Sequence, residues 1–257
     1  DDALAGARAA DESVRGHDGV GSVPSLLGAT VSFKDVVDVA GVPTTHSCGL
    51  LVDNIAEADS PIVRDVPNAG LAVLGKTNVP EFCTSMTSSR LNGTCRNPWD
   101  PERSPGGSSG GAAAALSAGL CAVAHGTDGA GSVRVPASYC GVVGVKGTRG
   151  LLARGPEEGT AYYGTSEDGV QTRSVRDEAA MLDALTGGRW PPAFGTDHLA
   201  AAATAPGPPR GAGCVAAPLG AADPERADAG GRAGAGPARG PRWSRRSRPF
   251  ARQRCGP

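Results

Sequence analysis

The chain has 257 residues and a formal net charge of −1, so it is long enough for one large domain and has no overall field that favours nucleic acid or an anionic membrane. Its hydrophobic content is 39%, and no apolar run approaches the roughly 18 residues that a membrane span needs. The sequence starts "DDALAGARAADE", with neither Met nor a signal-peptide pattern. We therefore interpret the start as truncated, within a helix, and expect no membrane or nucleic-acid partner.

The cysteines predict the reduced thiols of a cytoplasmic protein rather than a disulfide framework or a zinc site. Seven cysteines are scattered along the chain, an odd number without a CxxC pair. They are Cys48, Cys83, Cys95, Cys121, Cys140, Cys214 and Cys255.

Helical and strand patterns alternate along the first 200 residues, which predicts an α/β fold. The expected elements are, in chain order, a helix ending near residue 16, a strand within 28–41, a buried strand at 71–74, a surface loop at 87–107, a helix at 112–118, buried strands at 120–124 and 141–145, and a helix at 174–188. In this last helix Ser174 is the expected N-cap and Gly187 the expected end. Its expected apolar side consists of Val175, Met181, Leu182 and Leu185.

The character of the sequence changes after about residue 200, which predicts a domain at 1–200 and a tail at 201–257. Residues 227–257 contain eight Arg and one Asp and show no apolar periodicity. Such a segment cannot bury enough surface to offset its chain entropy. We interpret the tail as disordered or as sequence translated in a shifted frame; an Arg-rich nucleic-acid-binding tail is the alternative.

One stretch matches the phosphate-binding loop pattern GxxxxGK[ST], but its residues argue against that function. It reads "GLAVLGKT" from Gly70 to Thr77. The four residues between the glycines are apolar and favour a buried strand, whereas a phosphate loop must curl so that its amides face the phosphate. We therefore expect Lys76 to have a structural role near the end of a strand.

Two serine-containing, glycine-rich segments suggest nucleophilic chemistry. Ser108 and Ser132 lie on either side of an Ala-rich helical stretch. A serine nucleophile needs a base, but no histidine accompanies a GxSxG elbow, and His125 in its apolar run is interpreted as a packing residue. Only three of the 25 basic residues are lysines. Lys34 follows an apolar strand, where burial lowers the pKa of an amine enough for it to act as a base.

Several motifs resemble the amidase signature family in sequence and in order. The serine- and glycine-rich block at 106–148 is similar to the family's signature block. The agreement extends to "VSFKDVVDVAGVPTTHS" (31–47), "GKTNVPEF" (75–82), "NPWD" (97–100) and "TRSVRD" (172–177). The resemblance covers about residues 20–190, and nothing after about residue 225 resembles the family.

The resemblance implies a role for each matching position. Lys34 would be the base, Ser108 the bridging serine that follows a cis peptide bond, and Ser132 the acylated nucleophile. The implied oxyanion hole consists of the backbone amides of Gly129, Ala130, Gly131 and Ser132, with Asp128 and Arg134 as supporting residues. Ala130 stands where the family nearly always has glycine, and Gly147 where it has proline.

The resemblance further implies an α/β amidase-signature fold, with a mixed central sheet covered by helices and incomplete in its C-terminal half. The implied activity is hydrolysis of a linear carboxamide through an acyl-enzyme, without metal or cofactor. The expected partner is a small-molecule amide, and a homodimer is left open. The alternatives are the A-type subunit of a tRNA-dependent amidotransferase and a truncated, non-catalytic remnant.

Overall fold

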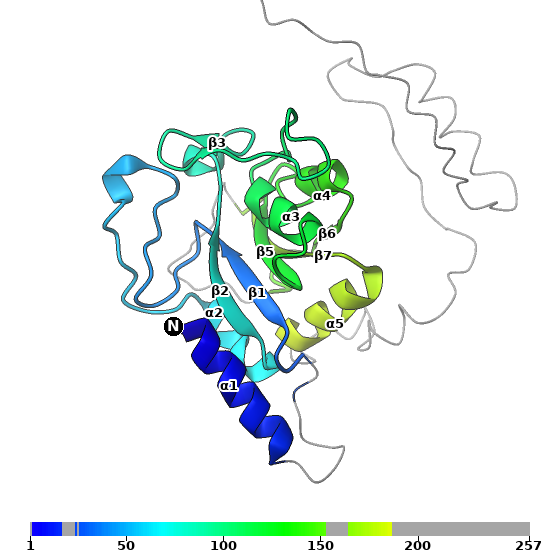
Figure 1. The fold of residues 1–257 in the computed structure, drawn as a ribbon. Coiled ribbons are helices and arrows are strands. Elements are labelled where there is room, and N and C mark those ends of the chain that lie inside the picture. The colour runs from blue at the N-terminus through cyan, green and yellow to red at the C-terminus, as the bar shows by residue number, and fades with distance from the viewer. Residues whose placement is uncertain (1, 17–23, 25, 153–163, 187–257) are drawn as a thin grey trace, which may run out of the picture. The chain divides into compact units, whose positions relative to one another are not determined.

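The computed structural model describes residues 2–16, 24, 26–152 and 164–186. Five α-helices and seven strands lie in these ranges (Figure 1). The helices are α1 (Asp2–Arg15), α2 (Pro61–Asp65), α3 (Gly110–Ser117), α4 (Arg134–Cys140) and α5 (Val175–Thr186). The strands are β1 (Thr30–Lys34), β2 (Ala72–Thr77), β3 (Ser88–Ser89), β4 (Gly93–Thr94), β5 (Val123–Asp128), β6 (Val143–Lys146) and β7 (Glu167–Thr172).

Five of these strands form one mixed sheet in the order β2-β1-β5-β7-β6. Strand β1 is parallel to both β2 and β5, whereas β7 is antiparallel to β5 and β6. The short strands β3 and β4 form a separate antiparallel pair within the expected 87–107 loop. The fold is therefore the expected α/β architecture with a mixed central sheet.

The two faces of the sheet are covered by different helices. On one face, α2 and α5 contribute to a core cluster with strand residues such as Val31, Phe33, Val123 and Val170. On the other face, α3 packs against β5 through a smaller cluster, and α4 packs against α3 and β6 (Figure 1). The shared sheet fixes the position of the α3 segment relative to the strand ends.

Small residues let α3 approach its neighbours closely. A Cβ added at Gly110 would lie 2.3 Å from the Thr87 hydroxyl, and one added at Gly111 would lie 2.4 Å from the Asn78 amide nitrogen. Both positions therefore exclude a side chain. Ala112, Ala113 and Ala114 are buried, and the helix starts at Gly110, two residues before its expected start.

Most expected elements are present with shifted ends. Leu120 is expected in a buried strand, but it is 69% exposed because its amide donates to Ala115 O and closes the turn that ends α3. Leu74 is also exposed, since β2 is an edge strand in the described sheet. In α5, the Ser174 hydroxyl accepts from the Asp177 amide as expected, but Val175 points outward. Gly187 lies outside the described residues, as does the predicted boundary near residue 200.

Strand β7 and the helices α2 and α4 have no counterpart in the expected elements. The sequence "EDGVQT" of β7 shows neither an apolar run nor a regular alternation, yet all six residues are buried. Its polar side chains find partners inside the domain: Gln171 Nε2, for example, donates to Val133 O at 2.7 Å. Tertiary hydrogen bonds have here overridden the local propensity.

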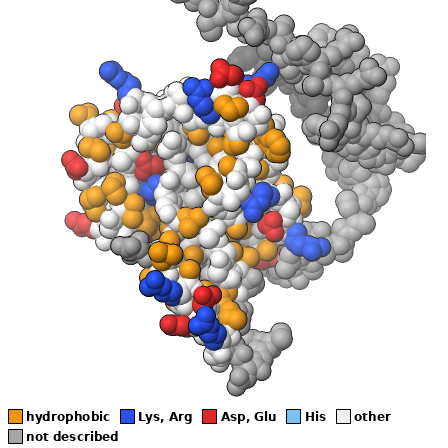
Figure 2. Space-filling model, in the orientation of Figure 1, with side chains coloured by type: hydrophobic (Ala, Val, Ile, Leu, Met, Phe, Trp, Pro, Cys, Tyr) orange, Lys and Arg blue, Asp and Glu red, His pale blue; other side chains and the backbone are white. Residues whose placement is uncertain are grey.

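The helices, the surface charge and the potential metal ligands of the described residues have the following properties. None of the helices in the described ranges combines the length and apolar character needed to cross a bilayer. On the face in Figure 2, basic and acidic side chains are interspersed among polar and apolar ones. Within the same ranges, no group of three or more His, Cys, Asp or Glu residues could hold a metal ion.

Helix α5 buries a carboxyl group without a full set of partners. Glu178 Oε2 accepts a hydrogen bond from the Thr172 hydroxyl at 3.0 Å, while Oε1 has no partner among the described residues. Burial raises the pKa of Glu178 to about 8, although the Thr172 hydrogen bond opposes the shift. The carboxyl is therefore held mainly in its protonated form at neutral pH.

We expect Glu178 to make the protein less stable as the pH rises. Between the ordinary glutamate pKa of 4.5 and about 8, the folded state holds a proton that the unfolded state has lost. The free energy of unfolding should then fall by up to about 1.4 kcal/mol per pH unit in this window. Urea unfolding of the Glu178→Gln variant should show a flatter pH dependence, whereas the exposed neighbour variant Asp177→Asn should keep the wild-type slope. An unchanged slope in Glu178→Gln would contradict this account.

Candidate active site

The candidate site lies where the parallel strands of the sheet end. Lys34, Thr77 and Asp128 are the last residues of β1, β2 and β5. Because these three strands are parallel neighbours, their carboxyl ends meet at one edge of the sheet. The segment that precedes α3 crosses the same edge and brings the serine pair to it, since Ser109 bonds to both β5 and the Ser132 loop.

Lys34 is completely buried and its amine has hydroxyl partners. Its Nζ donates to Ser108 Oγ and to Thr127 Oγ1, each at 2.8 Å, and lies 3.4 Å from Thr127 O. Burial lowers the pKa of Lys34, while interactions with Cys83, Asp128 and Asp168 act in the opposite direction. Such an amine is predisposed to be neutral and to accept a proton from a hydroxyl.

The two serines of the pair have different roles in the geometry. Ser108 is buried beside the lysine, and the peptide bond that precedes it, from Gly107, is cis, the conformation that the resemblance implies. Ser109 instead joins the neighbouring segments. Its amide donates to Ser132 O at 3.1 Å, and its hydroxyl lies 3.3 Å from Thr127 O. Ser109 thus ties the Ser108 segment to the loop that carries Ser132.

Ser132 is half-buried and faces the same cavity as Ser108. The cavity has a volume of about 330 Å³, and its lining includes both serines together with Thr127. Further lining residues are Cys83, Thr84, Gly129, Ala130, Thr165 and Ser166. The structure therefore brings Lys34 and Ser108 into direct contact and places Ser132 at the cavity that Ser108 also lines.

Asp128 organises the loop between Gly129 and Arg134. The carboxylate accepts hydrogen bonds from the Gly131 amide at 2.7 Å and from the Arg134 guanidinium at 2.8 and 2.9 Å. Burial would raise the pKa of Asp128, but the Arg134 hydrogen bonds and the loop amides overcome it and lower the pKa to about 2. Asp128 and Arg134 therefore brace the loop. The resemblance implies an oxyanion hole of the Gly129, Ala130, Gly131 and Ser132 amides, but the Gly131 amide already donates to Asp128.

Only one position of this loop requires glycine. Gly131 has φ of 109°, and a Cβ there would lie 3.0 Å from Val135 Cγ2. Gly129 and Ala130 have no positive φ. Ala130, which stands where the family nearly always has glycine, therefore adopts its conformation without backbone strain.

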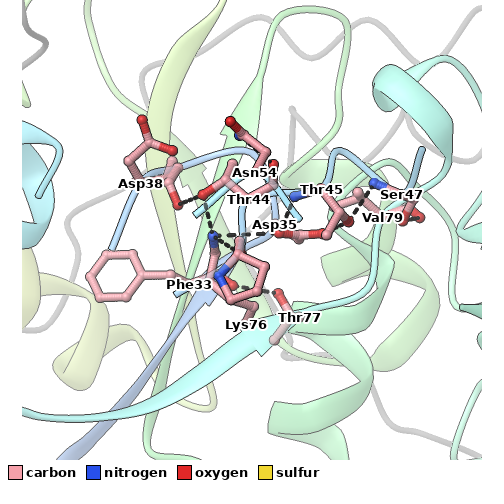
Figure 3. A network of polar contacts seen from close by, with 12 residues as sticks. Phe33, Asp35, Asp38, Thr44, Thr45, Ser47, Asn54, Lys76, Thr77 and Val79 are labelled. Carbon is pink, nitrogen blue, oxygen red and sulfur yellow. Dashed lines mark hydrogen bonds and ion pairs between the residues drawn. The ribbon is translucent and has the colours of Figure 1, made fainter. Parts of the chain in front are cut away.

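A second polar network includes Lys76 and Asp35, the residue that follows Lys34 in the chain (Figure 3). Lys76 Nζ lies 3.4 Å from Asp35 Oδ1 and donates to the Thr44 hydroxyl at 3.0 Å. Asp35 also accepts from the amide and the hydroxyl of Thr45. Burial lowers the pKa of Lys76, and Asp35 opposes this change. Because Lys76 lies within strand β2 and binds side chains of the same domain, it has the expected structural role and no phosphate loop is formed.

His125 also agrees with the sequence-based interpretation. Its side chain is buried, its Nε2 lies 3.1 Å from Asp168 Oδ1, and its ring packs against Phe33 with centroids 5.5 Å apart. His125 is therefore a packing residue with one side-chain hydrogen-bond partner, Asp168. That carboxylate belongs to strand β7 and not to either of the serine-containing segments.

Two residues of the site, Thr127 and Cys83, were not expected from the sequence. Thr127 supplies two of the oxygen partners of Lys34, and Cys83 lies on the cavity wall. Thr127 precedes Asp128 at the end of β5. A prediction that β1 and β5 are neighbours in the sheet would have indicated that Thr127 lies near Lys34. Cys83 follows β2 in a short 3-10 turn, Glu81–Cys83, and no local pattern marks it.

Comparison with known proteins gives consistent matches over the N-terminal part of the chain. Residues 1–203 match the family model described as Amidase. The candidate amidase AmiB2 of Mycobacterium tuberculosis is 43% identical over 203 residues, which are 78% of this chain and 43% of that protein. The A-type subunit of glutamyl-tRNA(Gln) amidotransferase from Oleidesulfovibrio alaskensis is 43% identical over 190 residues, 73% of this chain and 37% of that protein.

Solved structures show the same relationship. A substrate complex of 6-aminohexanoate cyclic dimer hydrolase has a TM-score of 0.63 and 40% identity, covering 71% of this chain and 37% of that chain. The A-type subunit of glutamyl-tRNA(Gln) amidotransferase from Thermotoga maritima has a TM-score of 0.57 and 35% identity, covering 69% of this chain and 42% of that chain. The chain thus spans less than half the length of the curated relatives and solved structures that it matches here.

We expect Lys34 to titrate below the ordinary lysine pKa of 10.5, because its amine is desolvated. The chain has only three lysines, so selective ¹⁵Nζ labelling gives three signals, which Lys→Arg variants at 34, 76 and 146 assign. Thr127→Val, which removes one hydroxyl partner, should change the Lys34 signal more than that of the distant Lys146. A Lys34 pKa at or above 10.5 would contradict the desolvation argument.

The backbone of the braced loop gives a matched pair of substitutions. Gly131→Ala should destabilise the protein by about 1–3 kcal/mol, because the new side chain adopts a disfavoured positive φ. Ala130→Gly should change stability by less than about 1 kcal/mol, since no strain is relieved there. Thermal or urea unfolding measures both; equal effects of the two substitutions would disprove the assignment of strain to Gly131.

Proposed function

The chain belongs to the amidase family, and on that premise we propose that it hydrolyses a carboxamide to a carboxylate and ammonia or an amine. The observation that carries this proposal is the 2.8 Å contact between the buried Lys34 amine and Ser108 Oγ. A desolvated lysine next to a serine is a known alternative to histidine as the base of a hydrolase. The shared cavity of Ser108 and Ser132 supports the assignment of Ser132 as the nucleophile.

The first half of the proposed reaction acylates Ser132. Neutral Lys34 accepts the Ser108 hydroxyl proton while Ser108 takes the proton of Ser132. The Ser132 oxygen then attacks the amide carbonyl, and the carbonyl π electrons move to oxygen. The backbone amides of Gly129, Ala130 and Ser132 stabilise the resulting oxyanion. When the tetrahedral intermediate collapses, the C–N bond breaks and the proton returns through Ser108 to the leaving nitrogen.

The second half releases the carboxylate. A water molecule gives one proton to the Ser108–Lys34 pair, and its oxygen attacks the acyl carbon. The C–O bond to Ser132 then breaks, and the proton goes back to the Ser132 oxygen. The carboxylic acid that forms loses the second proton of the water to solvent and leaves as the carboxylate. Side chains of this chain carry each proton, so the proposed steps involve no metal or cofactor. The braced Asp128–Arg134 pair keeps the loop amides in place without taking part in proton transfer.

We propose a linear carboxamide as the substrate of this reaction. One structural relative is described as a cyclic dimer hydrolase, so a cyclic amide is the relevant comparison compound. Ammonia or amine release from a panel that holds both kinds of amide distinguishes them. Faster hydrolysis of the cyclic amides would contradict the proposed linear substrate class but leave the proposed reaction steps unchanged.

The A-type subunit of a tRNA-dependent amidotransferase is a second candidate. The 43% identity to the Oleidesulfovibrio alaskensis subunit favours it as strongly as the mycobacterial match favours a free-standing amidase. The two candidates share the chemistry but differ in how activity depends on partners. Glutamine hydrolysis that appears only after other subunits are added would select the amidotransferase. A non-catalytic remnant is the remaining alternative, and cooperative thermal unfolding of the 257-residue chain would count against it.

The proposed roles predict the outcome of two substitutions in an ammonia-release assay. Ser132→Ala should abolish turnover because it removes the attacking oxygen. Lys34→Arg should be almost inactive although it keeps the charge, because arginine stays protonated and cannot act as a base.

Matched controls separate these effects from general damage to the fold. Ser117→Ala alters another serine whose hydroxyl binds Cys140 O, and Lys146→Arg alters a lysine at the end of β6. Both controls should keep most of the wild-type rate. Substantial hydrolysis by Ser132→Ala, full activity of Lys34→Arg, or no hydrolysis of any amide by the wild-type chain would refute the proposal.

A further inference from the structure

The residue that follows Ser132 is seated between three strands of the sheet. Val133 is completely buried, and one glycine from each of β5, β6 and β7 lies against it. Gly126, Gly144 and Gly169 form this glycine socket. A Cβ added at Gly126 or Gly144 would lie 3.0 Å from a Val133 methyl carbon, and one added at Gly169 would lie 3.2 Å away. The sheet therefore lacks side chains where the valine packs, and larger residues there would displace it.

The strand register places a glutamine beside this socket. Gly126 pairs with Gly169 across β5 and β7, and Gly144 pairs with Gln171 across β6 and β7. Alternate residues of a strand and directly paired residues of neighbouring strands share a face of the sheet. Gln171 therefore starts from the same face as the socket, two residues beyond Gly169.

Side chains of distant segments hold the main chain of Val133 at both ends. Its amide donates to Asp128 Oδ2 at 3.2 Å, and its carbonyl accepts from Gln171 Nε2 at 2.7 Å. Gln171 is completely buried, and its Oε1 has no partner among the described residues. The bond to Val133 O is thus the polar interaction through which this buried amide acts in the described structure. Leaving that carbonyl without its side-chain donor would loosen the peptide that follows Val133.

The two peptide groups that follow Ser132 are consequently fixed on both sides. In the first, the Ser132 carbonyl accepts from the Ser109 amide at 3.1 Å and the Val133 amide is held by Asp128. In the second, the Val133 carbonyl is held by Gln171 and the Arg134 amide donates to Asp128 Oδ2 at 3.3 Å. The Asp128 bonds shape the loop itself, whereas the seated valine and Gln171 tie it to the strands of the sheet.

We propose that Val133 and Gln171 are positioning residues that hold Ser132 at the candidate cavity. Neither belongs to the lining of that cavity in the described structure, so both act through the serine rather than on a substrate. This inference rests on the proposed hydrolase function, in which Ser132 is the nucleophile. Its consequence is kinetic, because a displacement of about 1 Å at a reacting atom can lower a rate about 100-fold.

The first test compares the same substitution at two valines. Val133→Ala empties the socket and should lower kcat for amide hydrolysis at least about tenfold, while KM changes by less than about twofold because the cavity lining is untouched. Val170→Ala is the matched control: Val170 is also completely buried, but it belongs to the core cluster on the other face of β7. It should lose stability and keep most of the wild-type kcat. Equal values of kcat in the two variants would overturn the role of Val133.

The second test removes the hydrogen bond to the Val133 carbonyl. Gln171→Leu keeps a side chain of similar size without a donor and should lower kcat about tenfold, again with little change in KM. Thr172→Val removes a buried hydroxyl that binds Glu178, from the next residue of the same strand. This control should keep most of the wild-type kcat. A change in KM alone, or the same kcat in both variants, would contradict the positioning role of Gln171.

The third test reads the loop without relying on activity. The Gly131 and Arg134 amides both donate to Asp128, so their hydrogen exchange, followed by NMR, reports how firmly the loop is held. Val133→Ala and Gln171→Leu should accelerate exchange at these two amides about tenfold relative to the amides of β1. Val170→Ala should not accelerate them more than those of β1. Unchanged relative exchange in both loop variants would contradict the inference.

The combined results distinguish this inference from the proposed function. If the wild type hydrolyses amides but Val133→Ala and Gln171→Leu have the kcat of their controls, only this inference fails. If the wild type hydrolyses no amide, the proposed function fails, and exchange at Gly131 and Arg134 alone then decides whether Val133 and Gln171 hold the loop.

Discussion

The desolvation of one amine is the constraint on which the rest of the site depends. Lys34 is buried at the end of β1, and a buried ammonium without compensation is costly. Two kinds of interaction compensate in part for this cost. Hydroxyl and carbonyl oxygens of Ser108 and Thr127 accept hydrogen bonds from Nζ, and the nearby acidic groups stabilise a positive charge on it at longer range. Burial nevertheless remains the larger effect and lowers the pKa of Lys34, so the neutral amine is accessible.

This constraint explains the composition of the block that surrounds α3. Ser108 can contact Lys34 only if its segment passes close over the ends of β1 and β5, and side chains at Gly110 and Gly111 would meet Thr87 and Asn78. The buried alanines after them keep the helix near β5. Close packing therefore requires glycine and alanine in this block. These small residues bury less apolar surface than larger ones would, and this smaller stabilisation accompanies the placement of the Ser108 hydroxyl next to the buried amine.

The sequence marks the candidate residues of this site more directly than it marks the strands of the sheet. An apolar strand and two glycine-rich segments draw attention to Lys34 and to the serines, and the family resemblance singles out Lys34, Ser108 and Ser132 among them. Strand β7 is missed because its polar residues are stabilised by partners from distant segments, as Gln171 is by Val133. The expectation for Leu120 is wrong because the turn that ends α3 has the same apolar composition as the start of a strand. Contacts between distant segments also explain why no local pattern marks the remaining cavity residues.

The loop that carries Ser132 and the strand that carries Lys34 are stabilised by different electrostatic means. Arg134 neutralises the buried Asp128, so that pair shapes the loop while leaving little net charge near Ser132. Lys34, in contrast, has no carboxylate among the hydrogen-bond acceptors of its amine in the described structure. A direct carboxylate partner would hold the lysine as an ammonium and remove the base. Separate bracing of the loop therefore positions Ser132, the proposed nucleophile, without placing a carboxylate on the amine of Lys34, the proposed base.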